Sequence, residues 1–370
     1  MRRISLPRAT TLGASAIVLA LGLSACGAGN EDNSEGNSGD GGSSVSGTLN
    51  GAGSSAQEAA IGVWTSNFQT DNSGVTVNYD PSGSSAGREQ FIEGGVQFAG
   101  SDAYLSDDEL SQAQGQCGGP AIEYPVYVSP IAIVYNLSDV DSLQLSPATL
   151  AQIFAGKITK WNDGAIAADN PDATLPDTDI NPVHRSDGSG TTDNFTDYLD
   201  AVDPTDWTGG ETDEWPKGLG GEGAEGTSGV ISAVQQGDGS IGYADFSQAG
   251  DLGVAAIKVG GGYVMPSADA ASKILDESTP VEGRDTATDL AIDVNRTSTT
   301  EGVYPIILVS YQLVCSTYSD QDMVDVVKAW ATYVISEDGQ NAAAQTAGSA
   351  PITDKLRDEA QAAIDSITAK

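Results

Sequence analysis

A stretch of glycine and hydroxyl residues, HRSDGSGTTDNFTDYL at positions 184–199, decides the fold that we expect for this chain. The preceding residues 179–183 are partly apolar and predict a strand, whereas Phe195, Tyr198 and Leu199 recur at the spacing of one helix face. The glycines therefore lie at a turn between a strand and a helix. There the first backbone N–H groups of the helix have no intrahelical partner and point outward with the positive end of the helix dipole. The turn is suited to binding an anion.

The side chains of this turn fit the same interpretation. Gly188 and Gly190 allow the backbone to approach a ligand closely, and Ser189 and Thr191 add hydroxyl donors. Arg185 supplies a planar, positively charged fork that suits a tetrahedral oxyanion. A single turn of this kind is also typical of ordinary loops, so support has to come from other segments.

Two further turns have the same character. Residues 51–56, GAGSSA, precede a helical pattern with Ile61, Trp64 and Phe68 on one face. Ser55 and Glu58 also fit a capping box, so an ordinary helix start stays open. Residues 82–87, SGSSAG, follow an alternating, strand-like run and lead into a helical pattern. Three such turns, each between a strand-like and a helix-like run, are harder to explain as unrelated loops.

Several short motifs, taken together, resemble a known family. They are GAG at 51–53, GSS at 83–85, AGSD at 99–102 with LSD at 105–107, ITKWND at 158–163 with AIA at 165–167, RSDGSGT at 185–191, WPKGLGG at 215–221 and GSIGY at 239–243. In this order they resemble the periplasmic phosphate-binding protein family of ABC transporters. The resemblance runs from about Gly47 to the C-terminal region of the chain.

The resemblance implies an α/β protein with the two-lobed periplasmic-binding-protein fold, type II or Venus-flytrap, and two crossover strands. Lobe 1 is expected to comprise residues 47–124 and 303–370, and lobe 2 residues 125–302. The crossovers are expected near residues 123–128 and 302–309. Strand-like runs that alternate with helical patterns support α/β lobes independently.

The resemblance also implies a phosphate-binding site. Its residues are expected to be Ser54, Ser55 and Ala56 in the first turn, Ser84 in the second, Asp102, and Arg185, Ser189, Gly190 and Thr191 in the third, with Asp187 placed to pair with Arg185. The family often has threonine and an aromatic residue where this chain has Ser55 and Ala56, a change that leaves backbone donation in place. Whether Ser54 and Ser85 contact the ligand is left open.

Asp102 is the most informative residue of this set, because a carboxylate beside an anion is favourable only when the anion carries a proton. Monohydrogen and dihydrogen phosphate can donate to Asp102, whereas sulfate near pH 7 has no proton to donate. A site built around a required donor can reject the analogue that lacks it by about 10⁴ to 10⁵. As an alternative, Asp102 merely caps the helix expected from Ser106 to Leu110.

The N-terminal residues predict export. Residues 1–25 contain three arginines, no acidic residue and an apolar run that is short for a membrane span of about 20 residues, which is typical of a signal peptide. Leu23–Cys26 resembles a bacterial lipoprotein cleavage box, so Cys26 is expected to carry lipid; an ordinary secretory cut is the alternative. The sequence from 26 to 46 is almost free of apolar residues, which predicts a flexible tether to the outer face of the cell membrane.

The charge of the chain excludes some partners. Without the three arginines of residues 1–25, 13 of the 16 Lys and Arg residues remain against 52 Asp and Glu, so the net charge changes from −36 to −39. Such a charge argues against nucleic acid and against anionic lipid as partners. Screening beyond about 8 Å lets buried dipoles and one arginine still bind an anion at contact distance.

Cys117 and Cys315 form an even pair once Cys26 is set aside, and in an exported protein this suggests a disulfide. Two free thiols remain the alternative. A bridge would tie an early segment to a late one, in agreement with the lobes that the resemblance implies.

The sequence therefore predicts a monomeric extracytoplasmic receptor, not an enzyme, that binds inorganic phosphate with high affinity and delivers it to an ABC permease for import. No cofactor or metal is expected, since three cysteines and one histidine provide no plausible zinc cluster. A receptor for another tetrahedral oxyanion is the nearest alternative. A serine hydrolase is a second alternative, because residues 83–87 match G-x-S-x-G with Ser85 as nucleophile and His184 later in the chain. It leaves Asp102 and Arg185 unexplained.

Overall fold

A computed structural model describes residues 45–370, and the structural statements that follow concern this part of the chain. The expected signal peptide, the lipidation of Cys26 and all but the last two residues of the tether lie outside the described residues. Among residues 45–370, no helix combines the length and the apolar character that crossing a bilayer requires.

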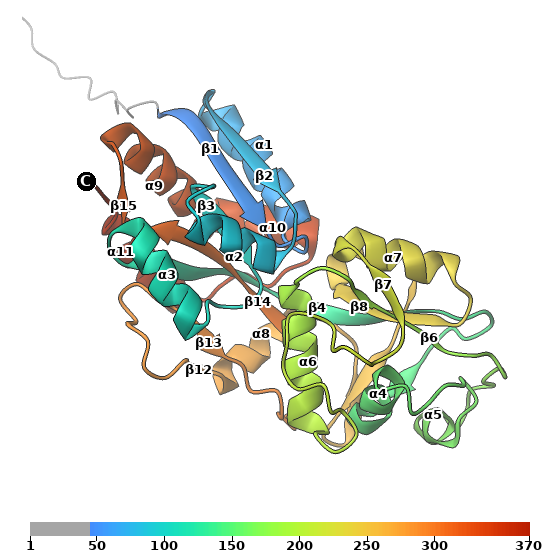
Figure 1. The fold of residues 1–370 in the computed structure, drawn as a ribbon. Helices are drawn as coiled ribbons and strands as arrows, with labels where there is room; N and C mark the ends of the chain where they lie inside the picture. The colour runs from blue at the N-terminus through green and yellow to red at the C-terminus, as the bar shows by residue number, and fades with distance from the viewer. Residues whose placement is uncertain (1–44) are drawn as a thin grey trace, which may run out of the picture. The chain divides into compact units, whose positions relative to one another are not determined.

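Helices and strands alternate along most of the described chain (Figure 1). The helices are α1 Glu58–Asp71, α2 Ser84–Ile92, α3 Asp107–Cys117, α4 Pro147–Phe154, α5 Gly164–Asp169, α6 Gly190–Val202, α7 Gly226–Gln236, α8 Ala268–Ser272, α9 Gln321–Ile335, α10 Glu337–Ala347 and α11 Asp354–Asp365. The strands of the largest sheet are β1 Ser46–Gly53, β2 Gly74–Asp80, β3 Phe98–Ser101, β4 Ala121–Asn136, β6 Asn181–Arg185, β7 Glu222–Ala224, β8 Ser240–Asp245, β9 Gly253–Val254 and β14 Ile307–Cys315. Smaller sheets are formed by β5 Gln144–Leu145 with β10 Ala256–Val259 and β11 Gly262–Val264, by β12 Thr279–Pro280 with β13 Ile292–Asp293, and by β15 Thr317–Tyr318 with β16 Thr368–Ala369.

The largest sheet has two parallel halves joined by antiparallel strands. Its strand order is β2-β1-β3-β14-β4-β8-β6-β7, with β9 paired to β4. In one half β1 is parallel to β2 and β3, and in the other β6 is parallel to β7 and β8. Between them, β14 is antiparallel to both β3 and β4, and β4 is antiparallel to β8. The α/β fold expected from the sequence is therefore confirmed.

The strand β4 belongs to both halves of the sheet. Its residues 121–130 pair with β14, whereas residues 131–136 pair with β8. This strand confirms the one expected at 123–128. Near the second expected crossover, at 302–309, the strand β14 begins at Ile307, because the Tyr304 N–H donates to the Ala270 carbonyl and Pro305 has no N–H for a ladder.

The three glycine- and hydroxyl-rich turns follow β1, β2 and β6 and precede α1, α2 and α6. Parallel strands of this kind place ligand sites beyond their carboxyl ends, at helix N-termini. The strand before the third turn, predicted at 179–183, is β6 and lies two residues later. Asp179 instead forms an isolated bridge with Lys160, while Arg185 still pairs with β7.

Two proposed helix caps differ from the structure. The capping box of Ser55 with Glu58 does not form, since α1 begins after Gln57 and has no side-chain cap. Asp102 does not cap α3 either. Ser106 does so, its hydroxyl accepting the Glu109 N–H at 3.3 Å in a complete capping box.

A disulfide joins Cys117 at the end of α3 to Cys315 at the end of β14, as the even pair of cysteines suggested. The two residues are 198 positions apart, so the bridge closes a long loop of the chain. A crosslink that closes a long loop stabilises the folded state mainly by restricting the unfolded chain.

Replacing both cysteines, Cys117→Ser with Cys315→Ser, is expected to lower the free energy of unfolding by about 2–4 kcal/mol. Urea unfolding followed by circular dichroism measures the change. The wild-type protein in reductant is the matched control and should unfold like the double variant. Equal stability of the oxidised wild-type protein and the double variant would contradict this role of the disulfide.

Candidate anion-binding site

A buried carboxylate lies at the centre of the candidate site. Asp102, directly after β3, is only 2% exposed. Its Oδ2 accepts the Ser54 hydroxyl at 2.5 Å, and its Oδ1 accepts the Ser310 hydroxyl at 2.6 Å. Its backbone N–H donates to the Ser84 hydroxyl oxygen at 3.1 Å. Asp102 thus connects the first turn, the second turn and β14.

Burial raises the pKa of Asp102 above its usual value, although the hydroxyls of Ser310 and Ser54 and the charge of Arg185 act in the opposite direction. The carboxylate receives hydroxyl hydrogen bonds and has no cation in direct hydrogen-bond contact. Each carboxylate oxygen keeps lone-pair capacity beyond the one hydroxyl that it accepts. Asp102 can therefore accept a further proton donor.

The third turn packs directly on Asp102. A Cβ atom placed on Gly190 would lie 2.8 Å from the Asp102 Cβ and 2.8 Å from the Ala103 nitrogen, so a side chain at this position would force the two segments apart. Asn194, one turn further along α6, donates from Nδ2 to the carbonyls of Asp102 at 2.5 Å and Gly190 at 2.8 Å. The N-terminus of α6 is therefore held against the end of β3.

Arg185 ends β6, is 2% exposed, and pairs with Asp187 through two nitrogens of its guanidinium. One of these bonds runs from Nε to Asp187 Oδ1 at 2.8 Å. The same Oδ1 accepts the Gly226 N–H at 3.0 Å, so Asp187 also contacts the start of α7. Burial raises the pKa of Asp187, but its hydrogen bonds and the positive charge of Arg185 outweigh burial and lower the pKa overall. Asp187 stays charged and fixes the orientation of the Arg185 fork.

The start of α6 offers donors toward Asp102. Gly190 and Thr191 are the first residues of α6, whose first-turn N–H groups have no intrahelical acceptor. The Thr191 hydroxyl is buried and has no hydrogen-bond partner among residues 45–370. Ser189 is the N-cap, and its hydroxyl oxygen accepts the Thr192 N–H at 3.2 Å.

The first turn makes hydrogen bonds within the protein. The Ser55 hydroxyl lies 3.1 Å from the Thr227 hydroxyl and accepts the Thr227 N–H at 3.1 Å, at the start of α7. The Ala56 N–H, expected to serve a ligand, here donates to the Ser54 hydroxyl oxygen at 3.1 Å. Ser54 therefore connects α1 and Asp102, and Ser55 connects β1 with a fourth helix N-terminus.

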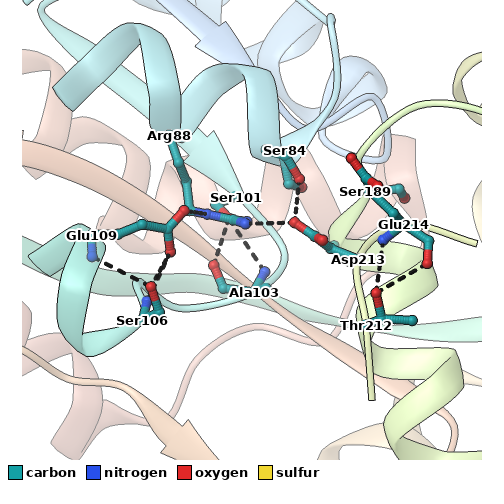
Figure 2. Close-up of polar contacts among 12 residues, drawn as sticks. Ser84, Arg88, Ser101, Ala103, Ser106, Glu109, Ser189, Thr212, Asp213 and Glu214 are labelled. Atoms are coloured by element: carbon teal, nitrogen blue, oxygen red, sulfur yellow. Dashed lines mark hydrogen bonds and ion pairs between the residues drawn. The ribbon is translucent and has the colours of Figure 1, made fainter. Parts of the chain in front are cut away.

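Sequence reasoning missed several residues of this region, which are Arg88, Asn194, Asp213, Thr227 and Ser310. Ser310 and Gln312 are the polar residues of the largely apolar sequence IILVSYQLV, and that contrast is a signal that could have pointed to Ser310. The others come from helices and a loop whose neighbours depend on the fold. Figure 2 shows a dashed line from Arg88 to Asp213, with Ser84 and Ser189 in the same region.

The residues of the hydrolase alternative have other partners. The Ser85 hydroxyl donates to Asp213 Oδ2 at 2.6 Å. The His184 ring contacts the Arg185 carbonyl oxygen through Nδ1 at 2.8 Å and stacks on Trp215 with centroids 4.6 Å apart. A nucleophile needs its base within hydrogen-bond reach, and among the described residues no hydrogen bond joins Ser85 to His184.

Comparisons with known proteins agree with this geometry. A family model for the PBP superfamily domain matches residues 38–338. The phosphate-binding protein PstS 3 of Mycobacterium tuberculosis is 39% identical over 371 residues, covering 96% of this chain and 98% of that protein. PstS 2 of the same organism is 36% identical at the same coverage.

A solved structure of the high-affinity periplasmic phosphate-binding protein PfluDING, bound with phosphate, superposes with a TM-score of 0.70. Its sequence is 24% identical, and the match covers 85% of this chain and 93% of that one, so it supports the fold alone. The fold and the buried site define a member of the PBP superfamily with the type II fold. Within that class, the chain belongs to the PstS family of phosphate-binding proteins.

Asp193 on α6 gives a pH-dependent test of this region. Burial and the negative charge of Glu211 raise its pKa to about 7, against the opposing charge of Arg88. The unfolded chain should have a pKa of about 3.9 here, so the folded state binds this proton more tightly. Its contribution to the free energy of unfolding is therefore largest at low pH and is lost as the pH rises from about 4 to about 7.

We expect the wild-type protein to lose more stability than Asp193→Asn as the pH rises through this window. Chemical unfolding at pH 4, 5.5 and 7 measures the difference between the two proteins. Asp322→Asn, at an exposed position of α9, is the control for the loss of one surface carboxylate. The free energy of unfolding of the wild-type protein minus that of Asp193→Asn should fall as the pH rises. A difference that stays constant or increases with pH would contradict the raised pKa of Asp193.

Proposed function

We propose that this chain binds inorganic phosphate with high affinity outside the cytoplasm and delivers it to an ABC permease for import. The observation that carries the proposal is the meeting of three strand-to-helix turns around Asp102. The PstS names of relatives that match nearly the whole chain support the same ligand. Ser54, Ser55, Ala56, Ser84, Asp102, Arg185, Ser189, Gly190 and Thr191, with Asp187 in support, are proposed as the site.

The chemistry of the donors favours phosphate over other tetrahedral oxyanions. Arg185 and the first-turn N–H groups of α6 supply positive potential, which any such anion would accept. Asp102 is an acceptor, and its burial prevents water from separating it from a ligand. A protonated phosphate oxygen can donate to Asp102, whereas a fully deprotonated anion would place two acceptors in contact. The predicted preference therefore rests on Asp102.

The two-lobed arrangement remains our proposal, with lobe 1 at 47–124 and 303–370 and lobe 2 at 125–302. Its support is that β4 pairs with one half of the sheet and then with the other. The rings of Phe68 and Phe98, from the early part of the chain, pack on Trp330 of α9 with centroids 5.4 and 5.7 Å apart. The Cys117–Cys315 bridge adds a covalent link between the same parts.

We further propose that the protein is a monomeric receptor that catalyses no reaction. The partners of Ser85 and His184 described above leave the hydrolase alternative without support. We also propose export through a signal peptide at 1–25 and a tether at 26–46 with lipid on Cys26. The sequence pattern of the N-terminal residues supports both. Labelling of Cys26 with a radioactive fatty acid in an expressing bacterium would test the anchor.

Titration of the wild-type protein with phosphate and sulfate by calorimetry tests the proposed function directly. Phosphate should bind and sulfate should not at comparable concentrations. In Asp102→Asn the amide can donate a hydrogen bond to sulfate but gives phosphate a weaker acceptor. The dissociation constant for sulfate divided by that for phosphate should therefore fall by at least about 100-fold. The reason is that discrimination of about 10⁴ to 10⁵ depends on the pairing of Asp102 with a protonated oxygen.

Asp71→Asn, at an exposed position of α1, is the matched control and should keep the wild-type ratio. Circular dichroism and thermal unfolding of each variant establish that it is folded. Unchanged selectivity in folded Asp102→Asn would count against the role of Asp102. A wild-type protein that binds neither anion would contradict the proposed function itself.

A further inference from the structure

Each of the three guanidinium nitrogens of the buried Arg88 on α2 binds a protein group. Its Nε donates to Glu109 at 2.9 Å and its Nη1 to the Ser101 hydroxyl at 3.2 Å. Its Nη2 donates to Asp213 Oδ2 at 2.9 Å. Figure 2 shows these contacts in a row beside Ser84. The Arg88 charge is therefore directed at two carboxylates, of which Asp213 comes from a distant part of the chain.

Asp213 contacts the start of two helices at once. Its Oδ2 also accepts the Ser85 hydroxyl at 2.6 Å, in the first turn of α2. Its backbone carbonyl accepts the N–H of Ser189, the N-cap of α6, at 2.9 Å. One residue thus holds together two of the turns that we assign to the anion.

The two groups that Asp213 joins belong to different halves of the sheet. The helix α2 packs against β1 and β3. The loop that contains Asp213 connects α6, which directly follows β6 of the other half, to β7 of that same half. Between Arg88 and Asp213 the chain runs the whole length of β4. The Asp213 side chain therefore spans the gap between the lobes that we propose.

We propose that Asp213 is a latch residue that slows the release of phosphate by joining α2 to the α6–β7 loop in the closed protein. The inference rests on the proposed function, and it makes Asp213 a positioning residue that does not touch the anion. Its contacts with Arg88 and Ser85 are charge-assisted hydrogen bonds, which are shorter and stronger than neutral ones. They break when the two halves separate, so they stabilise the closed state relative to the open one.

The ion pair also resolves an electrostatic conflict. A carboxylate close to an anion site would repel the ligand if it carried an uncompensated charge. The Arg88 guanidinium, which Asp213 shares with Glu109, lies 2.9 Å from Asp213 and offsets part of that charge; the Arg88 side chain is only 6% exposed, against 31% for Asp213. Arg88 therefore reduces the repulsion that Asp213 would exert on an anion.

The test is Asp213→Asn, which removes the charge and leaves the backbone carbonyl that binds Ser189. We expect the dissociation constant for phosphate to rise about 10-fold, almost entirely through faster release, because a contact made only after closure changes dissociation more than association. Radiolabelled phosphate chased with unlabelled phosphate measures the release rate. The thermal midpoint of the variant without phosphate establishes that it is folded.

Glu214→Gln is the matched control, because Glu214 is the next residue of the loop, is exposed, and undergoes the same change of charge. It should release phosphate at the wild-type rate. Ser85→Ala should also speed release, and its effect should be less than additive with that of Asp213→Asn because both break one contact. High salt should speed release from the wild-type protein more than from Asp213→Asn.

Phosphate release from Asp213→Asn at the wild-type rate, or tighter binding by this variant, would overturn the latch and leave the proposed function intact. An equal increase of the release rate in Glu214→Gln would overturn the latch as well, because the loss of any negative charge in this loop would then explain the effect. Failure of the wild-type protein to bind phosphate would overturn the proposed function, and the latch with it.

Discussion

The burial of the Asp102 carboxylate is the constraint on which the rest of this site depends. Taking a carboxylate out of water is unfavourable unless hydrogen bonds replace the water. Here the replacements are hydroxyls of Ser54, after β1, and Ser310, on β14, each on a separate oxygen. These two strands flank β3, which carries Asp102 at its end. The order of the strands therefore satisfies the buried charge without a directly bonded cation, and the carboxylate remains a strong acceptor.

The strongly negative chain can present an anion site because buried guanidinium groups offset part of the negative charge near it. Arg185 pairs with Asp187, whereas Arg88 is shared by Asp213 and Glu109. The local potential therefore depends also on the helix N-termini and on the orientation of Arg185. The acidic residues exposed elsewhere act through water and salt, which screen them beyond about 8 Å. Net charge is therefore a poor guide to the ligand of a buried site.

Local patterns predicted the parts of the structure that local chemistry determines. Glycine and hydroxyl residues between strand-like and helix-like runs indicated all three turns, and the even cysteines indicated the disulfide. The partners of those turns could not be predicted, since they depend on which strands pair and in which register. Asp213 meets Ser85 across 128 positions, and Thr227 meets Ser55 across 172. The alternative of a capping box at Ser55 was wrong because the Ser55 hydroxyl binds Thr227 at the start of a distant helix, which the local sequence does not reveal.

The position of Ser310 links the site to the strand pair that joins the two halves of the sheet. At this residue the register between β14 and β4 shifts: Ser310 lies opposite Tyr127, and Tyr311 opposite Pro125. An extra residue of this kind bends a strand and increases its twist, and such bulges are common beside functional sites. Only a few residues further along, β4 exchanges β14 for β8 as its partner. Any change in the twist of this pair would therefore move the hydroxyl that satisfies Asp102, so the buried charge and the connection between the two halves of the sheet are mechanically coupled.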